Sequence, residues 1–259
     1  MLELYKLTRP TPEVQRHREQ TIAELKRILT NRFGPQYVPA LFGSSRYGVS
    51  DRQSDLDIVI LDQDHPHGFT PTVYDRTLPA LYKLSDLAQL LRKKRYGKVI
   101  VIPAKVPIIK ARDPKTNLQI DININDRLGL FNTELLEHYC MFWPPLSNLI
   151  YVIKKWAKVR GLNEPAGLKK AGPTFSSYCL TLMIVGFLQS RGILPNLHEQ
   201  RPTNQQDRPY FWIKINKNSR MKCWVDWNHL SPSAWTPANN PSLGRAFYAW
   251  LQLSRVVRS

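Results

Sequence analysis

Three aspartates and one glycine–serine pair have the types and order of a site that handles phosphate groups and metal ions. Gly43-Ser44 is followed after ten residues by Asp55-x-Asp57, and Asp121 lies alone on a later strand-like segment. Carboxylate oxygens are the ligands that Mg²⁺ prefers, and two metals about 4 Å apart can activate an attacking hydroxyl and stabilise a phosphate leaving group. A glycine lets the backbone approach a phosphate closely. The set predicts nucleotidyl transfer.

The carboxylates are expected to share a sheet face, because residues two apart on a strand point the same way. Asp55 and Asp57 begin the segment Asp55–Leu61, whose remainder is apolar. In Leu118–Ile124 every even position is apolar and every odd position, Asp121 included, is polar. The apolar face would hold the strand on a core while the polar face meets water. If the two strands are neighbours, all three carboxylates converge.

The elements that would position these residues form an α+β fold. The first expected element is a helix that begins at Pro12 and ends near Thr30, and we expect it to pack on the second half of the chain. Alternating patterns and turn residues predict strands over 37–42, 55–61, 99–102, 106–111 and 118–124, and helices over 78–95, 146–159 and 176–189.

Two domains are expected from this order. Residues 35–140 would form a small mixed sheet with helices that carries the acidic motifs. Residues 1–34 and 141–259 would form a mostly helical domain.

The charge of the chain favours a polyanionic partner. The 37 Lys and Arg residues outnumber the 20 Asp and Glu residues, which gives a formal charge of +17. We expect nucleic acid as the first class of partner and an anionic membrane surface as the second. The 42% hydrophobic content excludes a disordered composition.

The cysteines and the hydropathy predict where the protein works. Cys140, Cys179 and Cys223 are odd in number and widely spaced, which indicates reduced thiols and neither disulfides nor a zinc site. The first ten residues lack the apolar run of a signal peptide, and no apolar run approaches the ~20 residues of a membrane span. We expect a cytoplasmic protein, with the nucleus as the alternative location.

With these residues identified, the chain resembles the DNA-polymerase-β-type nucleotidyltransferases, and more closely the terminal uridylyltransferase and cytoplasmic poly(A) polymerase family. The resemblance covers most of the chain. Besides the acidic motifs it rests on four segments: Phe131–Thr133, Ile150–Lys158, Pro173–Tyr178 and Pro241–Gly244. It implies a polymerase-β-type catalytic domain followed by the helical central (PAP-associated) domain of that family.

The resemblance also implies roles for individual residues. Lys154 and Lys158 would hold the β- and γ-phosphates of a nucleotide, Ser177 would contact phosphate and Tyr178 would stack on the base. Asn132 would contact the ribose. From the residues alone, the two lysines are equally well a solvated helix face, and Tyr178 could belong to the core.

The activity implied by the resemblance is template-independent addition of nucleotides to RNA 3′ ends, with UTP the first choice of substrate and ATP the second. Asp55, Asp57 and Asp121 would hold Mg²⁺, with Mn²⁺ as an alternative, and Asp121 would help to deprotonate the RNA 3′-hydroxyl. The expected partners are an RNA 3′ end and an NTP, with no membrane. The sequence indicates no particular protein partner, and the choice between uracil and adenine stays open.

Two other hypotheses fit the acidic motifs. One is a nucleotidyltransferase that acts on a small acceptor or makes an oligonucleotide signal. The other is a catalytically silent RNA-binding scaffold of the same fold. The last sixty residues hold five tryptophans, which could stack on RNA bases or fill a helical core.

Overall fold

The computed structural model describes residues 3, 7–69, 78–165, 167, 172–198, 208–216, 219–225, 227 and 229–256. The chain divides into two compact units. The first, here called the sheet unit, comprises Pro10–Leu135 and Asn204–Asp226. The second, here called the helical unit, comprises Met1–Arg9, Leu136–Thr203 and Trp227–Ser259.

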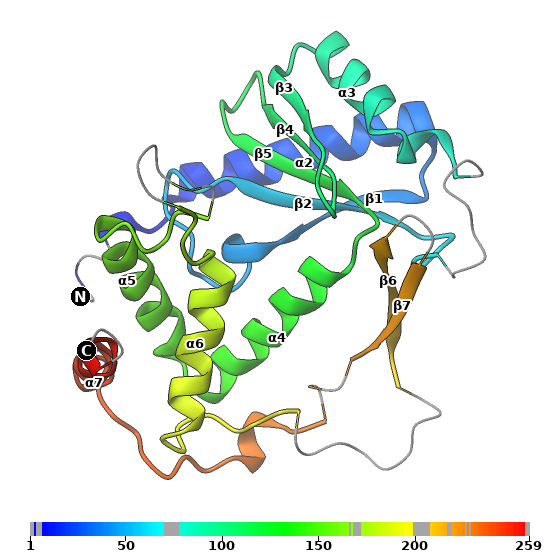
Figure 1. Cartoon of the computed structure of the whole chain (residues 1–259). Coiled ribbons are helices and arrows are strands. Elements are labelled where there is room, and N and C mark those ends of the chain that lie inside the picture. Colours follow the sequence, from blue (N-terminus) through cyan, green and yellow to red (C-terminus); the bar gives the residue numbers. More distant parts are fainter. Residues whose placement is uncertain are drawn as a thin grey trace. The chain divides into compact units, whose positions relative to one another are not determined.

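A five-stranded mixed sheet is the centre of the sheet unit (Figure 1). Its strands, in the spatial order β1-β2-β5-β4-β3, are β1 (Tyr37–Phe42), β2 (Leu56–Asp62), β5 (Gln119–Ile124), β4 (Ile108–Arg112) and β3 (Gly97–Ile102). Only β2 and β5 of these neighbours run parallel, and the other three pairs are antiparallel. The mixed sheet confirms the predicted fold class, and all five strands fall on predicted segments to within two residues at either end.

Helices account for most of the remaining described chain. The sheet unit contains α2 (Pro12–Phe33), α3 (Leu84–Lys93), the single turns η1 (Gly43–Ser45) and η3 (Ala80–Tyr82), and the start of α4 (Leu128–Phe142). The helical unit contains the end of α4, then α5 (Leu146–Val159), α6 (Ser177–Gln189), the single turn η4 (Pro232–Ala234) and α7 (Leu243–Val256). The helix predicted over 78–95 is two elements, because a single turn precedes α3.

Helix α2 begins as its sequence predicts but packs elsewhere. Thr11 caps it, since its Oγ1 accepts a hydrogen bond from the Val14 amide at 3.3 Å, and Pro12 occupies the first turn. The expectation that this helix packs on the second half of the chain was wrong. Its apolar stripe belongs to the core of the sheet, so α2 lies in the sheet unit. The predicted domains had placed residues 1–34 with the helices. The other predicted domain boundaries, at residues 140 and 141, stay a prediction.

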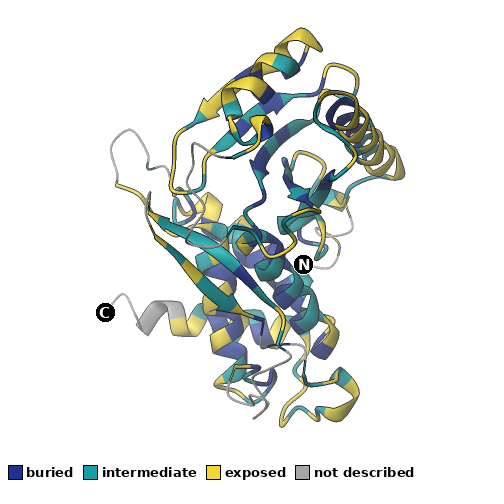
Figure 2. Ribbon diagram, turned by 90° about the vertical axis from the view of Figure 1, so that its right-hand side faces the viewer, coloured by how far each residue is buried: buried dark blue, intermediate teal, exposed yellow. Residues whose placement is uncertain are grey.

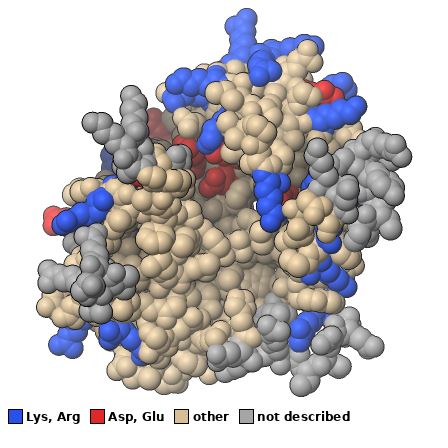
Figure 3. Space-filling view, in the orientation of Figure 1, with Lys and Arg blue, Asp and Glu red and all other residues tan. Residues whose placement is uncertain are grey.

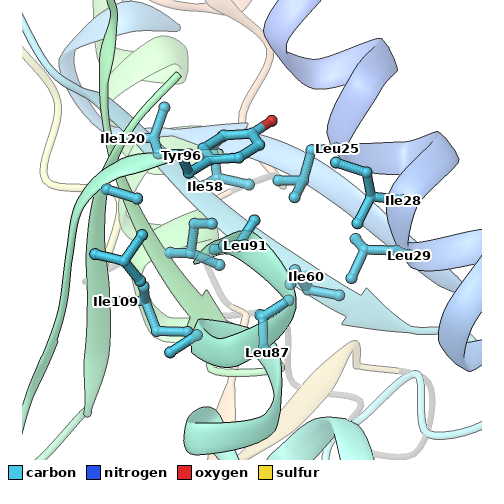
Figure 4. Packing of buried hydrophobic residues seen from close by; sticks show 14 of the residues in the cluster. Leu25, Ile28, Leu29, Ile58, Ile60, Leu87, Leu91, Tyr96, Ile109 and Ile120 are labelled. Atoms are coloured by element: carbon cyan, nitrogen blue, oxygen red, sulfur yellow. The ribbon is translucent and has the colours of Figure 1, made fainter. Parts of the chain in front are cut away.

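The core lies between one face of the sheet and two helices. Figure 4 shows side chains of α2 and α3 directed at the strands, with Leu25, Leu91 and Ile58 among those that meet. Ile120 and Ile122, two of the even positions of β5, are completely buried in the same cluster, and Ile124 packs against it partly buried. Figure 2 shows the outward side of the helices exposed, while the central strands β2 and β5 are buried or half-buried. The opposite face of β5 therefore carries its polar residues, as the alternation predicts, and the opposite face of β2 carries Asp57.

A two-stranded hairpin was not predicted. Strands β6 (Tyr210–Asn216) and β7 (Ser219–Trp224) pair antiparallel within a stretch that we expected to be mostly helical. The hairpin belongs to the sheet unit, where the ring of Phe211 stacks on Phe131 at a centroid distance of 4.4 Å. Burial of Phe211 on one face and charge on the other explains why this segment forms strands.

Two further expectations can be compared with the structure. Cys140, Cys179 and Cys223 are free thiols, which confirms that they form no disulfide with one another. Within the described ranges, no helix is both long enough and apolar enough to cross a membrane.

Removal of the Leu25 side chain tests the packing of α2 on the sheet. Leu25 is completely buried in the core cluster, so Leu25→Ala is expected to lower the free energy of unfolding by about 2–5 kcal/mol. Lys26→Ala, the neighbouring exposed position, should change it by less than about 0.5 kcal/mol. Urea denaturation of both variants would measure this, and equal midpoints would contradict the packing.

Candidate active site

Two of the predicted carboxylates are aligned by the only parallel strand pair of the sheet. Asp57 of β2 lies directly opposite Asp121 of β5 in the register, so their backbones are about 4.8 Å apart and their side chains share a face. On the far side of Asp121, Lys110 of β4 occupies the same row. Three charged side chains thus lie side by side on the face that turns away from the core.

Asp121 and Lys110 form an ion pair across β5 and β4. The Lys110 ammonium binds Oδ2 of Asp121, whose side chain is 16% exposed. The other oxygen, Oδ1, is buried and accepts no hydrogen bond from any described residue. A buried carboxylate oxygen without a donor is costly, so this atom is suited to a cation or to the proton of a substrate.

Asp55 immediately precedes β2 and lies close to the same charges. Its Oδ2 accepts a hydrogen bond from the Gln119 side-chain amide at 3.3 Å. Burial raises the pKa of the Asp55 carboxyl, and the negative charge of Asp121 raises it further, while Lys110 opposes the shift. Two carboxylates that disfavour each other's charge form a site that gains from a bound cation.

The glycine–serine turn stands at the end of β1, next to Asp57. Gly43 has a φ of 74°, in the left-handed region that favours glycine. A β-carbon at this position would lie 2.3 Å from Oδ2 of Asp57, so no larger residue fits without moving that carboxylate. The Gly43 amide donates to Oγ1 of Thr133 at 2.7 Å, which ties the turn to α4. Ser44 follows in the single turn η1, at the same end of the sheet.

The donor set suits divalent metal, although the side chains do not form a closed cage. Among the residues that the structure describes, no three His, Cys, Asp or Glu side chains are grouped closely enough to hold a metal as they stand. The unsatisfied Oδ1 of Asp121, the elevated pKa of Asp55 and the glycine beside Asp57 nevertheless fit oxygen-ligated Mg²⁺. Figure 3 shows acidic side chains gathered in the upper part of the view, where Figure 1 draws the sheet, with basic side chains around them.

Two predicted phosphate contacts in the helical unit are linked through one short segment of chain. Lys158, near the end of α5, forms an ion pair with Glu164 at 2.6 Å. Ser177, the first residue of α6, donates its hydroxyl to Oδ1 of Asn163 at 3.1 Å. Because Asn163 and Glu164 are consecutive, one short segment ties the lysine to the positive N-terminal end of α6. That combination of an ammonium and a helix N-terminus suits an anion.

The other predicted nucleotide contacts, Lys154, Tyr178 and Asn132, lie on three different helices. Lys154 is half-buried one turn before Lys158 on the same face of α5, and Tyr178 on α6 is 37% exposed, so its ring is only partly packed in the core. Asn132 is half-buried on α4 in the sheet unit. The carboxylates and these helical-unit residues belong to different units, so their convergence on one nucleotide stays a prediction.

Sequence reasoning missed three contributors. Lys110, Gln119 and Thr133 contact Asp121, Asp55 and the Gly43 amide respectively. Gln119 could have been found, since it shares the polar face of β5 with Asp121. Lys110 could not, because its position depends on the register of β4 against β5.

These features have the arrangement of the polymerase-β-type nucleotidyltransferase fold: a mixed sheet that presents aspartates beside a glycine–serine turn. Residues 1–141 match the family model described as poly(A) RNA polymerase, mitochondrial-like, central palm domain. The match covers more than half of the chain, and the chain belongs to this family.

Curated relatives support the same assignment. The poly(A) RNA polymerase cid11 of Schizosaccharomyces pombe is 30% identical over 197 residues, which cover 74% of this chain and 38% of that protein. The poly(A) RNA polymerase GLD2-A of Xenopus laevis is 35% identical over 182 residues, which cover 70% of this chain and 34% of that protein. The matched part of the chain thus spans little more than a third of the length of these relatives.

Solved structures share the fold. The Cid1 poly(U) polymerase with bound MgGTP superposes with a TM-score of 0.68 at 22% identity, over 97% of this chain and 71% of that one. A cytoplasmic RNA terminal U-transferase gives a TM-score of 0.65 at 22% identity, over 97% of this chain and 68% of that one. These likenesses confirm that the chain has the polymerase-β-type fold together with a helical domain.

Gly43→Ala should displace the Asp57 carboxylate and weaken the binding of an NTP–Mg²⁺ complex. The reason is the 2.3 Å approach of the added carbon to Asp57 together with the positive φ. We expect roughly a tenfold or greater rise in Kd, measured with a fluorescent NTP analogue. Gly97→Ala on β3, where the added carbon meets only Arg112 at an ordinary 3.7 Å, is the matched control. Equal affinities of the two variants would contradict this role of Gly43.

The stability of the metal-free protein should depend on the Asp55 charge. Because its pKa is raised in the folded state, the folded protein binds this proton more tightly than the unfolded chain. Its contribution to stability therefore decreases as the pH rises from about 4 through the elevated pKa. Asp55→Asn should remove this loss, so that thermal unfolding in EDTA favours the variant more at pH 7 than at pH 4. If the Asp55→Asn protein gained nothing between these pH values, the shift would be contradicted.

Proposed function

We propose that the protein is a template-independent RNA nucleotidyltransferase that adds UMP, or AMP, from an NTP to RNA 3′ ends. The observation that carries the proposal is the row of Asp57 and Asp121 on adjacent parallel strands, with Gly43-Ser44 at its end, in a chain of this family. The formal charge of +17 suits an RNA substrate. Two of the relatives are poly(A) RNA polymerases, and one structural neighbour is a poly(U) polymerase.

In this proposal Asp55, Asp57 and Asp121 hold Mg²⁺, with Mn²⁺ as an alternative ion. The Cid1 structure with MgGTP supports the use of magnesium by a protein of this fold. When bound, such ions activate the attacking hydroxyl and neutralise the charge that develops on the leaving pyrophosphate.

The side chains of the sheet unit position the reacting groups. Asp121 accepts the proton of the RNA 3′-hydroxyl at Oδ1, the oxygen to which no described residue donates. Lys110 holds Oδ2 of the same carboxylate and so fixes its orientation. Thr133 engages the Gly43 amide, so Ser44 is the residue of the turn that meets a phosphate.

The helical unit supplies the remaining nucleotide contacts by resemblance to the family. Lys154 and Lys158 hold the β- and γ-phosphates, Ser177 contacts phosphate and Tyr178 stacks on the base. Release of Lys158 from its ion pair with Glu164 accompanies this step, because the ammonium must turn from a carboxylate to a phosphate. From the sheet unit, Asn132 on α4 contacts the ribose in the same scheme.

Extension of RNA by an Asp57 variant tests the proposal. A labelled single-stranded RNA would be incubated with each NTP separately, in Mg²⁺ or in EDTA. Wild-type protein should extend it only with metal, and Asp57→Ala should reduce the rate by at least about a hundredfold, because a metal ligand is lost. Asp64→Asn, which removes one negative charge at an exposed position, should leave the rate unchanged.

The outcomes separate the hypotheses. Metal-dependent extension that Asp57→Ala abolishes supports the proposal, and the preferred NTP decides between UMP and AMP addition. RNA binding without extension would favour the silent scaffold. Reaction of nucleotides without RNA would favour a small-acceptor enzyme.

A further inference from the structure

One face of the β6–β7 hairpin is built of aromatic side chains at its open end and basic side chains toward its turn. Residues that face each other in an antiparallel pair lie on the same side, as do residues two apart along a strand. The register therefore places six side chains on one face: Tyr210, Trp212 and Lys214 on β6, with Trp224, Lys222 and Arg220 opposite them on β7. Three of the six are aromatic, three are cationic and none is acidic. The reverse face packs inward through Phe211, which is 3% exposed.

Within this face, Trp212 is the aromatic side chain that borders a cavity. Tyr210 already has two partners: the His67 ring stacks on it at 4.4 Å, and the Lys222 ammonium lies 3.9 Å from its centroid. The same ammonium lies 4.1 Å from the Trp224 ring. Trp212, in contrast, lines a cavity of about 230 Å³ in the sheet unit. That volume is below the range of drug-sized ligand pockets and suits a single planar group.

The backbone of Trp212 is held in place by a neighbouring loop. Its amide donates to the carbonyl of His67 at 2.7 Å. A β-carbon at Gly68, whose φ is 76°, would lie 3.1 Å from the Trp212 carbonyl oxygen, so the loop lies close against the strand. An aromatic ring on a fixed backbone loses little freedom when a flat ligand stacks on it.

The cavity walls combine stacking surfaces with positive charge. Besides Trp212, the aromatic wall contains Phe69 and Tyr82. Four cationic residues line the cavity, Lys83, Lys105, Lys214 and Arg220, against one carboxylate, Asp126, so the net formal charge is +3 (four minus one). A ring stack beside cations suits a ligand with a flat base and a phosphate. The further aromatic and basic side chains on the same face of the hairpin suit a strand of several nucleotides.

The cavity continues from the strand that carries the candidate catalytic carboxylate. Ile124, Asn125 and Asp126, at the end of β5 and just beyond it, line the cavity. Asp121 lies three residues before Ile124 on β5, which corresponds to about 10 Å of strand. Asp121 and Ile124 point to opposite faces of β5, so an RNA whose 3′ end lies at Asp121 would pass the end of the strand to bring an upstream nucleotide to the cavity.

We propose that the aromatic–basic face of the β6–β7 hairpin, together with this cavity, binds an unpaired stretch of the substrate RNA, with one base stacked on Trp212 and its phosphates held by Lys214 and Arg220. The inference rests on the proposed function, since it takes RNA as the substrate. It assigns to the hairpin the task of holding the RNA upstream of the reacting end. The bases must be single-stranded, because paired bases do not present a free face for stacking.

The test measures RNA binding in EDTA and without NTP, so that it does not depend on catalysis. Fluorescence anisotropy of a labelled single-stranded oligoribonucleotide would give Kd at several salt concentrations. Trp212→Ala should raise Kd about 5- to 150-fold, because a stacked base is lost, and Trp212→Phe should restore most of the affinity. The double variant Lys214→Glu/Arg220→Glu should also reduce the slope of log K against log salt by about 1.4, because two phosphate contacts are lost. Lys26→Glu/Lys93→Glu changes charge equally at exposed positions of α2 and α3 and should leave that slope unchanged.

Each result decides the inference separately from the proposed function. Wild-type affinity in Trp212→Ala and an unchanged salt slope in the charge variant would overturn it, even if Asp57→Ala abolished extension. Equal binding of double-stranded RNA, or loss of affinity in the Lys26/Lys93 control to the same degree, would also overturn it. Cross-linking of a 4-thiouridine RNA to the Tyr210–Asn216 strand would support it, even if extension failed. Circular dichroism of every variant identifies any that fails to fold, and the Trp212→Phe rescue then carries the test.

Discussion

The parallel pairing of β2 with β5 is the constraint on which the candidate site depends. It places Asp57 beside Asp121. The apolar residues on the opposite face of the two strands are buried in the core, and their burial fixes this register. A slip of β5 by one residue would turn Ile120 and Ile122 away from the core and bury Asp121. The same burial that stabilises the sheet thus holds two like charges side by side, so the core and the site cannot be altered independently.

The remaining parts of the sheet unit relieve the cost of this arrangement. Lys110 supplies a compensating charge from the next strand, and Gln119 supplies a hydrogen bond to Asp55. Thr133 ties the glycine turn to α4, so that the turn is held against Asp57 by a helix. Each contact comes from a different element. The electrostatics of the site therefore depend on correct packing of the whole unit.

How far the sequence could predict this structure depended on the range of the interactions. Tyr37–Phe42 and Leu146–Val159 were predicted with the bounds that the structure has, because alternation and helical periodicity are local. The face of Asp121 followed from the same alternation. The pairing of Lys110 with Asp121 and the packing of α2 on the sheet were beyond reach, because both depend on which distant segments become neighbours. The hairpin was not predicted because its tryptophans and lysines were considered only for their number. The side chains of Tyr210–Asn216 nevertheless alternate between a buried and a basic–aromatic face.

The Lys110–Asp121 ion pair has a consequence for the order of events in the life of the molecule. Many small metal-binding domains are unfolded until the metal arrives, since only the ion compensates the clustered ligands. Here an ammonium already compensates part of the charge at the site. The sheet unit therefore does not depend on a metal ion for this part of its charge compensation. Under the proposed function, folding of the chain and assembly of the reactive centre are then separate steps, and a fall in free magnesium is expected to stop the reaction without unfolding the protein.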